Sequence, residues 1–268
     1  MVVTADFVFV HLHKCGGSFL TEALLRYVPT ARRVGYHYPC WKIPDAHRHL
    51  PILGVVRNPW DFYVSYHAFQ SGLLERARAA NGARTAAELE RLIDEGRDPW
   101  NGIDALFEEL SGRGALGFPD ACRHYLSFTR EAGLFDRVLE RLPAAFDHRA
   151  HGEPVERGEG FRGMNLRRQD LAPFHGVAAG LYTVLFRHLF GAGEGVEFLR
   201  METLREELLA WFERHGVAVS RALADFVRHA ERINTSAHAP YRTYYDAELA
   251  GLVARVDGEL IARFGYAL

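Results

Sequence analysis

Residues 7–25 read FVFVHLHKCGGSFLTEALL, an apolar run that breaks at Lys14 and two glycines and then resumes with helical spacing. The run Phe7–Val10 is aromatic and β-branched, which favours a strand buried on both faces of a sheet. The glycines allow a tight turn, and we expect Ser18 to cap a helix that ends before Pro29. A loop of this kind points backbone N–H groups and the positive end of a helix dipole at one spot. The stretch therefore predicts an anion site.

Lys14 is the second unusual feature of this loop. It precedes the first glycine, whereas the Walker A loop, G-x-x-x-x-G-K-[ST], places its lysine after the last one. Of the 32 Lys and Arg residues, only Lys14 and Lys42 are lysines. Because the chain uses arginine for almost every other positive charge, a lysine here indicates a point contact to a phosphate or leaving-group oxygen.

A second strand with a polar end is expected at residues 51–56, PILGVV, followed at once by Arg57. Asn58 as cap and Pro59 at the first helical position then form a strong helix start. Ser65 lies about two turns further along that helix. Since ligands of open parallel sheets bind at the carboxyl ends of strands, Arg57 is a candidate ligand residue.

The rest of the chain alternates helical segments with weaker strand candidates at 31–38 and 196–200. This alternation predicts one α/β domain covering residues 1–268. Residues 147–170 are poor in apolar side chains and rich in glycine and charge, so they predict a long flexible loop. Such a loop is either a lid beside the site or an insert without function.

Helix caps are expected at three places near the C-terminus. Thr203 with Glu206 matches a capping box, and Ser220 can cap a short helix. Asp246 is expected to cap one long amphipathic helix that ends near Phe264.

Composition narrows the class of protein. The formal charge is −2, which gives no general attraction for nucleic acid or an anionic membrane, so anion binding must be local. Three cysteines, at 15, 40 and 122, are too scattered for a zinc signature, and no apolar run is long enough to span a bilayer. A cytoplasmic protein with reduced thiols is the simplest expectation, and Cys15 is either a small loop filler or a reactive thiol.

Together the two motifs, HLHKCGGS at 11–18 and VVRNPWDFYVSY at 55–66, resemble those of the sulfotransferases that use 3′-phosphoadenosine 5′-phosphosulfate (PAPS). The likeness is to the branch of Golgi carbohydrate sulfotransferases and their bacterial relatives. Its first loop commonly reads F-[IV]-H-[IV]-P-K-[TC]-[GA]-G-[TS]-[ST] and grips the 5′-phosphosulfate. The positions that match here are Phe9, Val10, His11, Leu12, Lys14, Cys15, Gly16, Gly17 and Ser18. His13 replaces the usual proline, and Phe19 replaces a small hydroxyl residue.

The second family motif resembles V-R-[ND]-P-x-[DE]-R-x-x-S-x-[YF], whose Arg and Ser bind the 3′-phosphate. Arg57 and Ser65 occupy those positions, while Phe62 departs from the usual arginine. A closing segment similar to N-x-S-x-H-x-x-Y-x-x-Y-Y is matched by Asn234, Ser236, His238, Tyr241, Tyr244 and Tyr245. By analogy this segment would fold over the nucleotide.

The resemblance implies a three-layer fold like that of the P-loop NTPases, with a central parallel sheet flanked by helices. It also implies sulfuryl transfer from PAPS to an acceptor hydroxyl, with adenosine 3′,5′-bisphosphate (PAP) as product and no metal. Lys14 would be catalytic as stabiliser of the leaving phosphate. The expected donor-binding residues are Lys14, Cys15, Gly16, Gly17, Ser18, Phe19, Arg57, Ser65, Ser236 and Tyr241.

A general base is also needed, and His37 in GYHYP, between the two motifs, is the candidate. A structural or substrate-contacting role for His37 is the alternative, and His13 is the second candidate base. The resemblance favours a glycan or a small-molecule acceptor.

Two other functions remain open. One is a nucleotide-binding small-molecule kinase, which the order of residues in the loop disfavours. The other is a protein that binds PAP or PAPS without catalysis, which the departures at His13 and Phe19 keep open.

Overall fold

The computed structural model describes residues 1–35, 37–81, 105–142, 166–231, 233 and 236–268. The chain divides into two compact units. The first contains the described residues of 1–58 and 185–235, and the second those of 59–146, 159–184 and 236–268. The single domain expected over 1–268 stays a prediction.

The first unit contains a five-stranded sheet in the order β3-β1-β2-β4-β5. Its strands are β1 (Val2–Val3), β2 (Val8–Val10), β3 (Arg32–Arg33), β4 (Ile52–Val56) and β5 (Val196–Arg200). β2, β4 and β5 are parallel, with Val10 opposite Gly54 and Val56 opposite Arg200. The strands expected within 7–10, 51–56 and 196–200 are therefore confirmed, while the candidate at 31–38 shrinks to two residues.

The expectation of a parallel sheet is wrong for its other edge. β1 pairs antiparallel with both β2 and β3. The physical reason is the short connection from β1 to β2, in which the Thr4 N–H donates to the Phe7 carbonyl at 3.0 Å. A turn of that length can join only antiparallel strands, because parallel neighbours need a long crossover.

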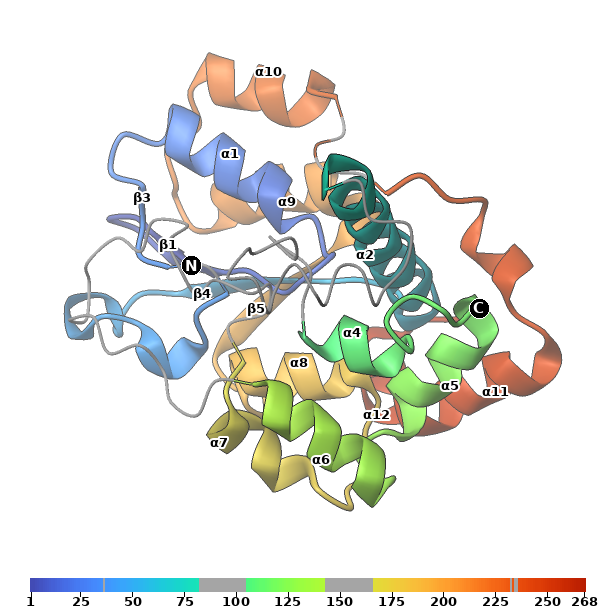
Figure 1. The fold of residues 1–268 in the computed structure, drawn as a ribbon. Helices are drawn as coiled ribbons and strands as arrows, with labels where there is room; N and C mark the ends of the chain where they lie inside the picture. The colour runs from blue at the N-terminus through green and yellow to red at the C-terminus, as the bar shows by residue number, and fades with distance from the viewer. Residues whose placement is uncertain (36, 82–104, 143–165, 232, 234–235) are drawn as a thin grey trace. The chain divides into compact units, whose positions relative to one another are not determined.

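Helices pack on both faces of this sheet. The helices concerned are α1 (Gly17–Tyr27), α8 (Leu181–Phe190), α9 (Leu204–Arg214) and α10 (Arg221–His229). Phe7 lies 5.0 Å from the Trp211 ring of α9, and Figure 1 shows α1, α9 and α10 gathered on that side. Phe198 of β5 packs at 5.0 Å on Phe190 of α8, whereas its neighbour Glu197 accepts a hydrogen bond from Trp211. Successive residues of a strand face opposite ways, so α8 and α9 cover opposite faces of β5. The protein is a mixed α/β structure.

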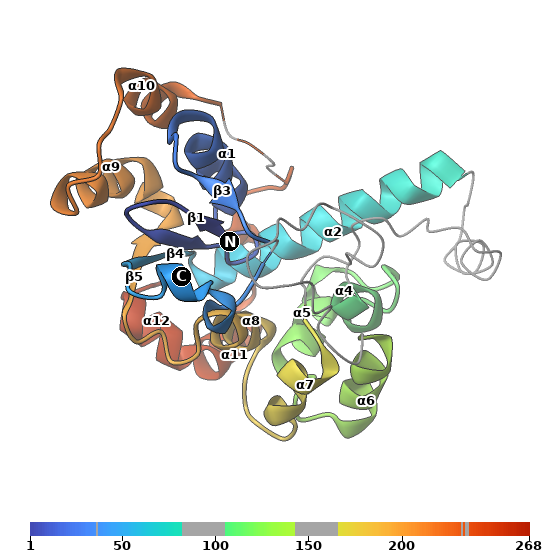
Figure 2. The ribbon, with the colours of Figure 1, turned by 90° about the vertical axis from the view of Figure 1, so that its left-hand side faces the viewer.

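The second unit is helical in its described residues. Its helices are α2 (Pro59–Asn81), α4 (Ala105–Leu110), α5 (Phe118–Ser127), α6 (Ala132–Arg141), α7 (Arg168–Leu171), α11 (Ala247–Val256) and α12 (Gly258–Phe264). Figure 2 shows α4, α5, α6 and α7 clustered together. α2 begins at Pro59, as predicted.

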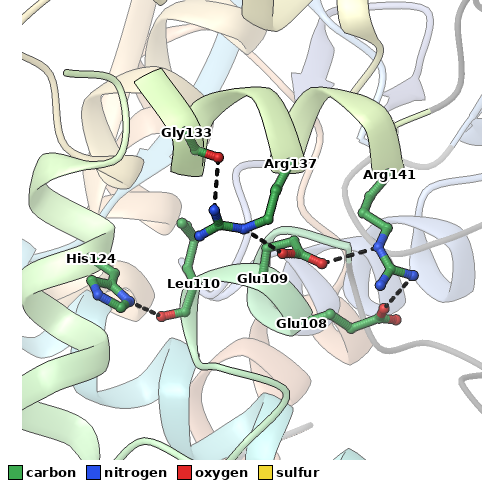
Figure 3. Close-up of polar contacts among 7 residues, drawn as sticks. All are labelled: Glu108, Glu109, Leu110, His124, Gly133, Arg137 and Arg141. Atoms are coloured by element: carbon green, nitrogen blue, oxygen red, sulfur yellow. Dashed lines mark hydrogen bonds and ion pairs between the residues drawn. The ribbon is translucent and has the colours of Figure 1, made fainter. Parts of the chain in front are cut away.

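Charged side chains join α4 to α6, as Figure 3 shows. Arg141 Nε lies 3.0 Å from one Glu109 oxygen, and Arg137 Nε lies 3.5 Å from the other. The Glu109 side chain is only 9% exposed, so two guanidinium groups compensate a largely buried carboxylate. These ion pairs link α4 to α6.

A buried carboxylate interrupts the C-terminal helix. Asp246 caps α11 as predicted, accepting from the Leu249 N–H at 2.7 Å. However, the single helix expected up to Phe264 is wrong, because it breaks at Asp257. Burial raises the pKa of this carboxyl to about 6. Hydrogen bonds from Thr183 and Tyr63 oppose this increase but do not cancel it.

Other local expectations had mixed outcomes. Ser220 caps α10, accepting from the Leu223 N–H at 3.1 Å. The capping box at Thr203 is wrong, because the Thr203 hydroxyl donates to Glu207 instead. A flexible loop was expected at 147–170. Residues 147–165 lie outside the described residues, and residues 168–170 form the first part of α7. No helix in the described residues is long and apolar enough to cross a membrane.

Candidate functional site

The loop between β2 and α1 has an unusual backbone. Lys14 has a φ of 57° and Gly16 a φ of 74°, both in the left-handed region. Gly16 is the N-cap of α1, so the expectation that Ser18 caps the helix is wrong, and Ser18 lies within the first turn. A left-handed lysine costs about 1–2 kcal/mol, and strain of this kind concentrates at functional sites.

A neighbouring side chain leaves room only for glycine at position 17. A Cβ on this residue would lie 1.8 Å from the His11 ring, so the imidazole fills the space that any other residue would need. Burial lowers the pKa of His11 well below its usual value, and the nearby His37 lowers it further. His11 is therefore a neutral packing residue that shapes the loop.

Arg57 is held against this loop. It directly follows β4, is 7% exposed, and donates from Nη1 to the Lys14 carbonyl oxygen at 2.9 Å. Burial and the positive charge of Arg57 together lower the pKa of Lys14 to about 7. The structure thus brings together the two basic residues that the sequence places at neighbouring strand ends.

Glu202 fixes the peptide that follows Arg57. The Asn58 N–H donates to Glu202 Oε1 at 2.7 Å, across 144 residues of sequence. No sequence pattern assigned a role to Glu202. A carboxylate just after a strand was the available signal, but its partner is a backbone N–H that no pattern identifies.

His37 lies beside the loop with a φ of 48°. Its Nδ1 is 3.0 Å from the His11 carbonyl oxygen. A carbonyl can only accept, so Nδ1 carries a hydrogen, and in the neutral form of the ring the lone pair would lie on Nε2. The ring of His13, the second candidate base, stacks on His37 with centroids 3.4 Å apart.

Cys15 and Phe19, which were predicted to bind PAPS, have side chains that lie in the core. Cys15 is fully buried, which fits a loop filler, and its N–H points at the Leu12 carbonyl at 3.4 Å. Phe19 is 7% exposed and stacks on Phe226 of α10 at 5.5 Å. Contact of Cys15 and Phe19 with PAPS stays a prediction.

The second unit contains the remaining predicted residues. Ser65 Oγ lies 3.0 Å from Ser236 Oγ, so the closing segment does reach the α2 serine. Tyr241 begins the short helix η5 (Tyr241–Tyr244), and the Tyr245 hydroxyl donates to the Trp60 carbonyl at 2.8 Å. Asn234 lies outside the described residues. Because Arg57 belongs to the first unit, its sharing of one phosphate with Ser65 stays a prediction.

Within the described ranges, no group of three or more His, Cys, Asp or Glu residues is arranged to hold a metal ion. In the histidine cluster the rings of His13 and His37 lie face to face, so they do not point nitrogens at a common centre. Comparison of the chain with protein-family models, with curated proteins and with solved structures found no match.

Proposed function

We propose that this protein is a sulfotransferase that moves the sulfuryl group of PAPS to a hydroxyl of a glycan or a small molecule. The observation that carries the proposal is the contact of Arg57 with the Lys14 carbonyl, where the parallel strands β2 and β4 end. The contact holds Arg57 against the loop that contains Lys14 and leads into the N-terminus of α1. Two basic residues beside a helix N-terminus suit a phosphate.

Lys14 supports transfer rather than binding alone. A lysine with a pKa near 7 is about half neutral at pH 7, so it becomes fully charged only when negative charge lies beside the amine. As the acceptor oxygen bonds to sulfur, the bond from sulfur to the bridging phosphate oxygen breaks, and that oxygen takes the electron pair. Lys14 would neutralise this charge, with the first-turn N–H groups of α1.

His37 is the proposed general base. With Nδ1–H on the His11 carbonyl, Nε2 is the nitrogen that carries the lone pair when the ring is neutral, and we assign it the acceptor proton. His37→Ala should lower kcat and leave PAP affinity intact, and unchanged turnover would remove it from this role.

The finer fold class belongs to the same proposal. Parallel β2, β4 and β5, with α8 and α9 on opposite faces of β5, support a three-layer arrangement like that of the P-loop NTPases. A cytoplasmic location, and action without metal or nucleic acid, are proposed with it.

Isothermal titration with PAP and with ATP tests the donor. Binding of PAP, with much weaker binding of ATP, is expected because the 3′-phosphate adds a charged contact. Tight binding of ATP together with no binding of PAP would overturn the proposal in favour of a kinase.

Transfer of radiolabelled sulfate from PAPS to a panel of glycans and hydroxylated small molecules tests catalysis. The Lys14→Met variant is the control, since it keeps the stem without the charge. Tight PAP binding with equal labelling by enzyme and control would indicate a binding protein.

A further inference from the structure

An acidic residue lies at the sheet edge where Arg57 contacts the loop of Lys14. Glu202 belongs to the short helix η4 (Met201–Thr203), which directly follows β5. Since β4 and β5 are parallel neighbours, Arg57 and Glu202 follow adjacent strand ends. The Glu202 carboxylate accepts from the Asn58 N–H at 2.7 Å, and this hydrogen bond holds it beside the peptide of Arg57.

The turn that carries Glu202 packs against the phosphate loop. A Cβ on Gly16, the N-cap of α1, would lie 3.6 Å from Met201 Cγ and 2.9 Å from Leu204 Cδ2. Glu202 lies between Met201 and Leu204 in the sequence, and its side chain is exposed. Its negative charge therefore acts on any anion bound at the N-terminus of α1.

Glu202 opposes the attraction of the two basic residues for an anion. Lys14 is about half neutral at pH 7, and Glu202 offsets the charge of Arg57, so the three side chains together carry little net charge. Because Glu202 is exposed, water screens it, and each like charge held about 8–10 Å away costs a factor of about three in affinity. A longer 5′-phosphate chain, which adds about one negative charge with each phosphate, therefore gains no affinity from this edge.

We propose that Glu202 is a specificity-determining residue that excludes nucleotides with a 5′-polyphosphate. Its charge leaves the phosphate loop suited to the 5′-phosphosulfate of PAPS, whose sulfate ionises only once, and unsuited to the triphosphate of ATP. The inference rests on the proposed function. It gives the selection of PAPS over ATP a second source, at the opposite end of the nucleotide from the 3′-phosphate.

Isothermal titration with AMP, ADP and ATP tests this charge, because the three nucleotides differ only in the length of the 5′-phosphate chain. EDTA is present throughout, since Mg²⁺ would neutralise the chain. Glu202→Gln removes the charge and keeps an oxygen that can accept from the Asn58 N–H. Glu213→Gln is the matched control, because it removes the same charge from an exposed position about 14 Å further along α9, beyond the Debye length of about 8 Å.

Wild type is expected to bind ATP no more tightly than AMP. Glu202→Gln should raise the affinity for ADP relative to AMP about threefold, and that for ATP relative to AMP about tenfold, because one and then two further charges escape the repulsion. Glu213→Gln should keep the wild-type ratios.

Tighter binding of ATP than of AMP by the wild type would overturn the inference, and this result needs no variant. Equal ratios of ATP to AMP affinity in wild type and Glu202→Gln would also overturn it, because any exclusion of ATP would then be steric. Absence of ATP binding to Glu202→Gln would do the same. If wild type does not bind PAP while Glu202→Gln gains affinity for ATP, the proposed function fails and the role of Glu202 stands.

Discussion

Binding of PAP is expected to load a proton onto Lys14. In the free protein, burial and then the charge of Arg57 lower the pKa of this lysine from 10.5 to about 7. A phosphate oxygen beside the amine favours the charged form and moves the pKa back up. Proton uptake on binding is therefore a direct measure of the contact between Lys14 and the ligand.

The magnitude follows from the fraction of Lys14 that is neutral before binding. If the bound lysine is fully charged, uptake is about 0.1 proton at pH 6, about 0.5 at pH 7 and about 0.9 at pH 8. By the same linkage, the dissociation constant of PAP should rise about fivefold from pH 7 to pH 8.

Isothermal titration at pH 8, in buffers of different ionisation enthalpy, measures this uptake as the slope of observed enthalpy against buffer enthalpy. A phosphate with its second pKa near 6 is already a dianion at that pH, so it contributes little. Lys14→Met should give a slope near zero. Equal slopes for the two proteins, or uptake that does not change between pH 6 and pH 8, would refute the reasoning.

The ligand-free protein provides an independent check on the same lysine. The folded pKa of about 7 lies below the ordinary value of 10.5, so between these values the unfolded chain binds more protons. Stability should therefore rise with pH across that window, and the rise should be smaller in Lys14→Met. Urea unfolding at pH 7 and pH 9 measures the difference.

Three further variants test the surroundings of the site and the fold. Arg57→Ala should weaken PAP binding about 10–100-fold, through loss of a charged contact, and titration with unchanged affinity would contradict this. Gly17→Ala should lower stability by about 1–3 kcal/mol because its Cβ would lie 1.8 Å from the His11 ring, while Gly251→Ala in α11, the control, should be neutral or stabilising in urea unfolding. Tyr63→Phe should cost about 1.5–3 kcal/mol, since it removes the 2.6 Å hydrogen bond to the buried carboxylate that ends α11, and equal unfolding midpoints would show that this bond contributes nothing.

The sequence predicts the strand ends well because they are local. Apolar runs bounded by polar residues identify β2 and β4, and Lys14 and Arg57 follow them directly. Parallel pairing then brings the two residues to one edge. The strand β1 was missed because two residues, Val2–Val3, are too few to show a period.

The remaining features depend on partners distant in the chain. Asp257 sits in a segment with helical spacing and looks like a polar face residue, yet it is fully buried and accepts from Tyr63 and Thr183. The stack of His13 on His37 likewise follows from two loop conformations rather than from any spacing. In both cases the deciding contact is between side chains that no local pattern pairs.

The hydrogen bond from the Asn58 N–H to Glu202 determines when, during synthesis, the site can form. A nascent chain that ends before residue 196 contains Lys14 and Arg57 but lacks both β5 and the carboxylate that holds the peptide after Arg57. Closing a contact over 144 residues carries a large entropy cost and slows folding. If the proposed function holds, affinity for PAP should therefore arise only after the ribosome has added Glu202.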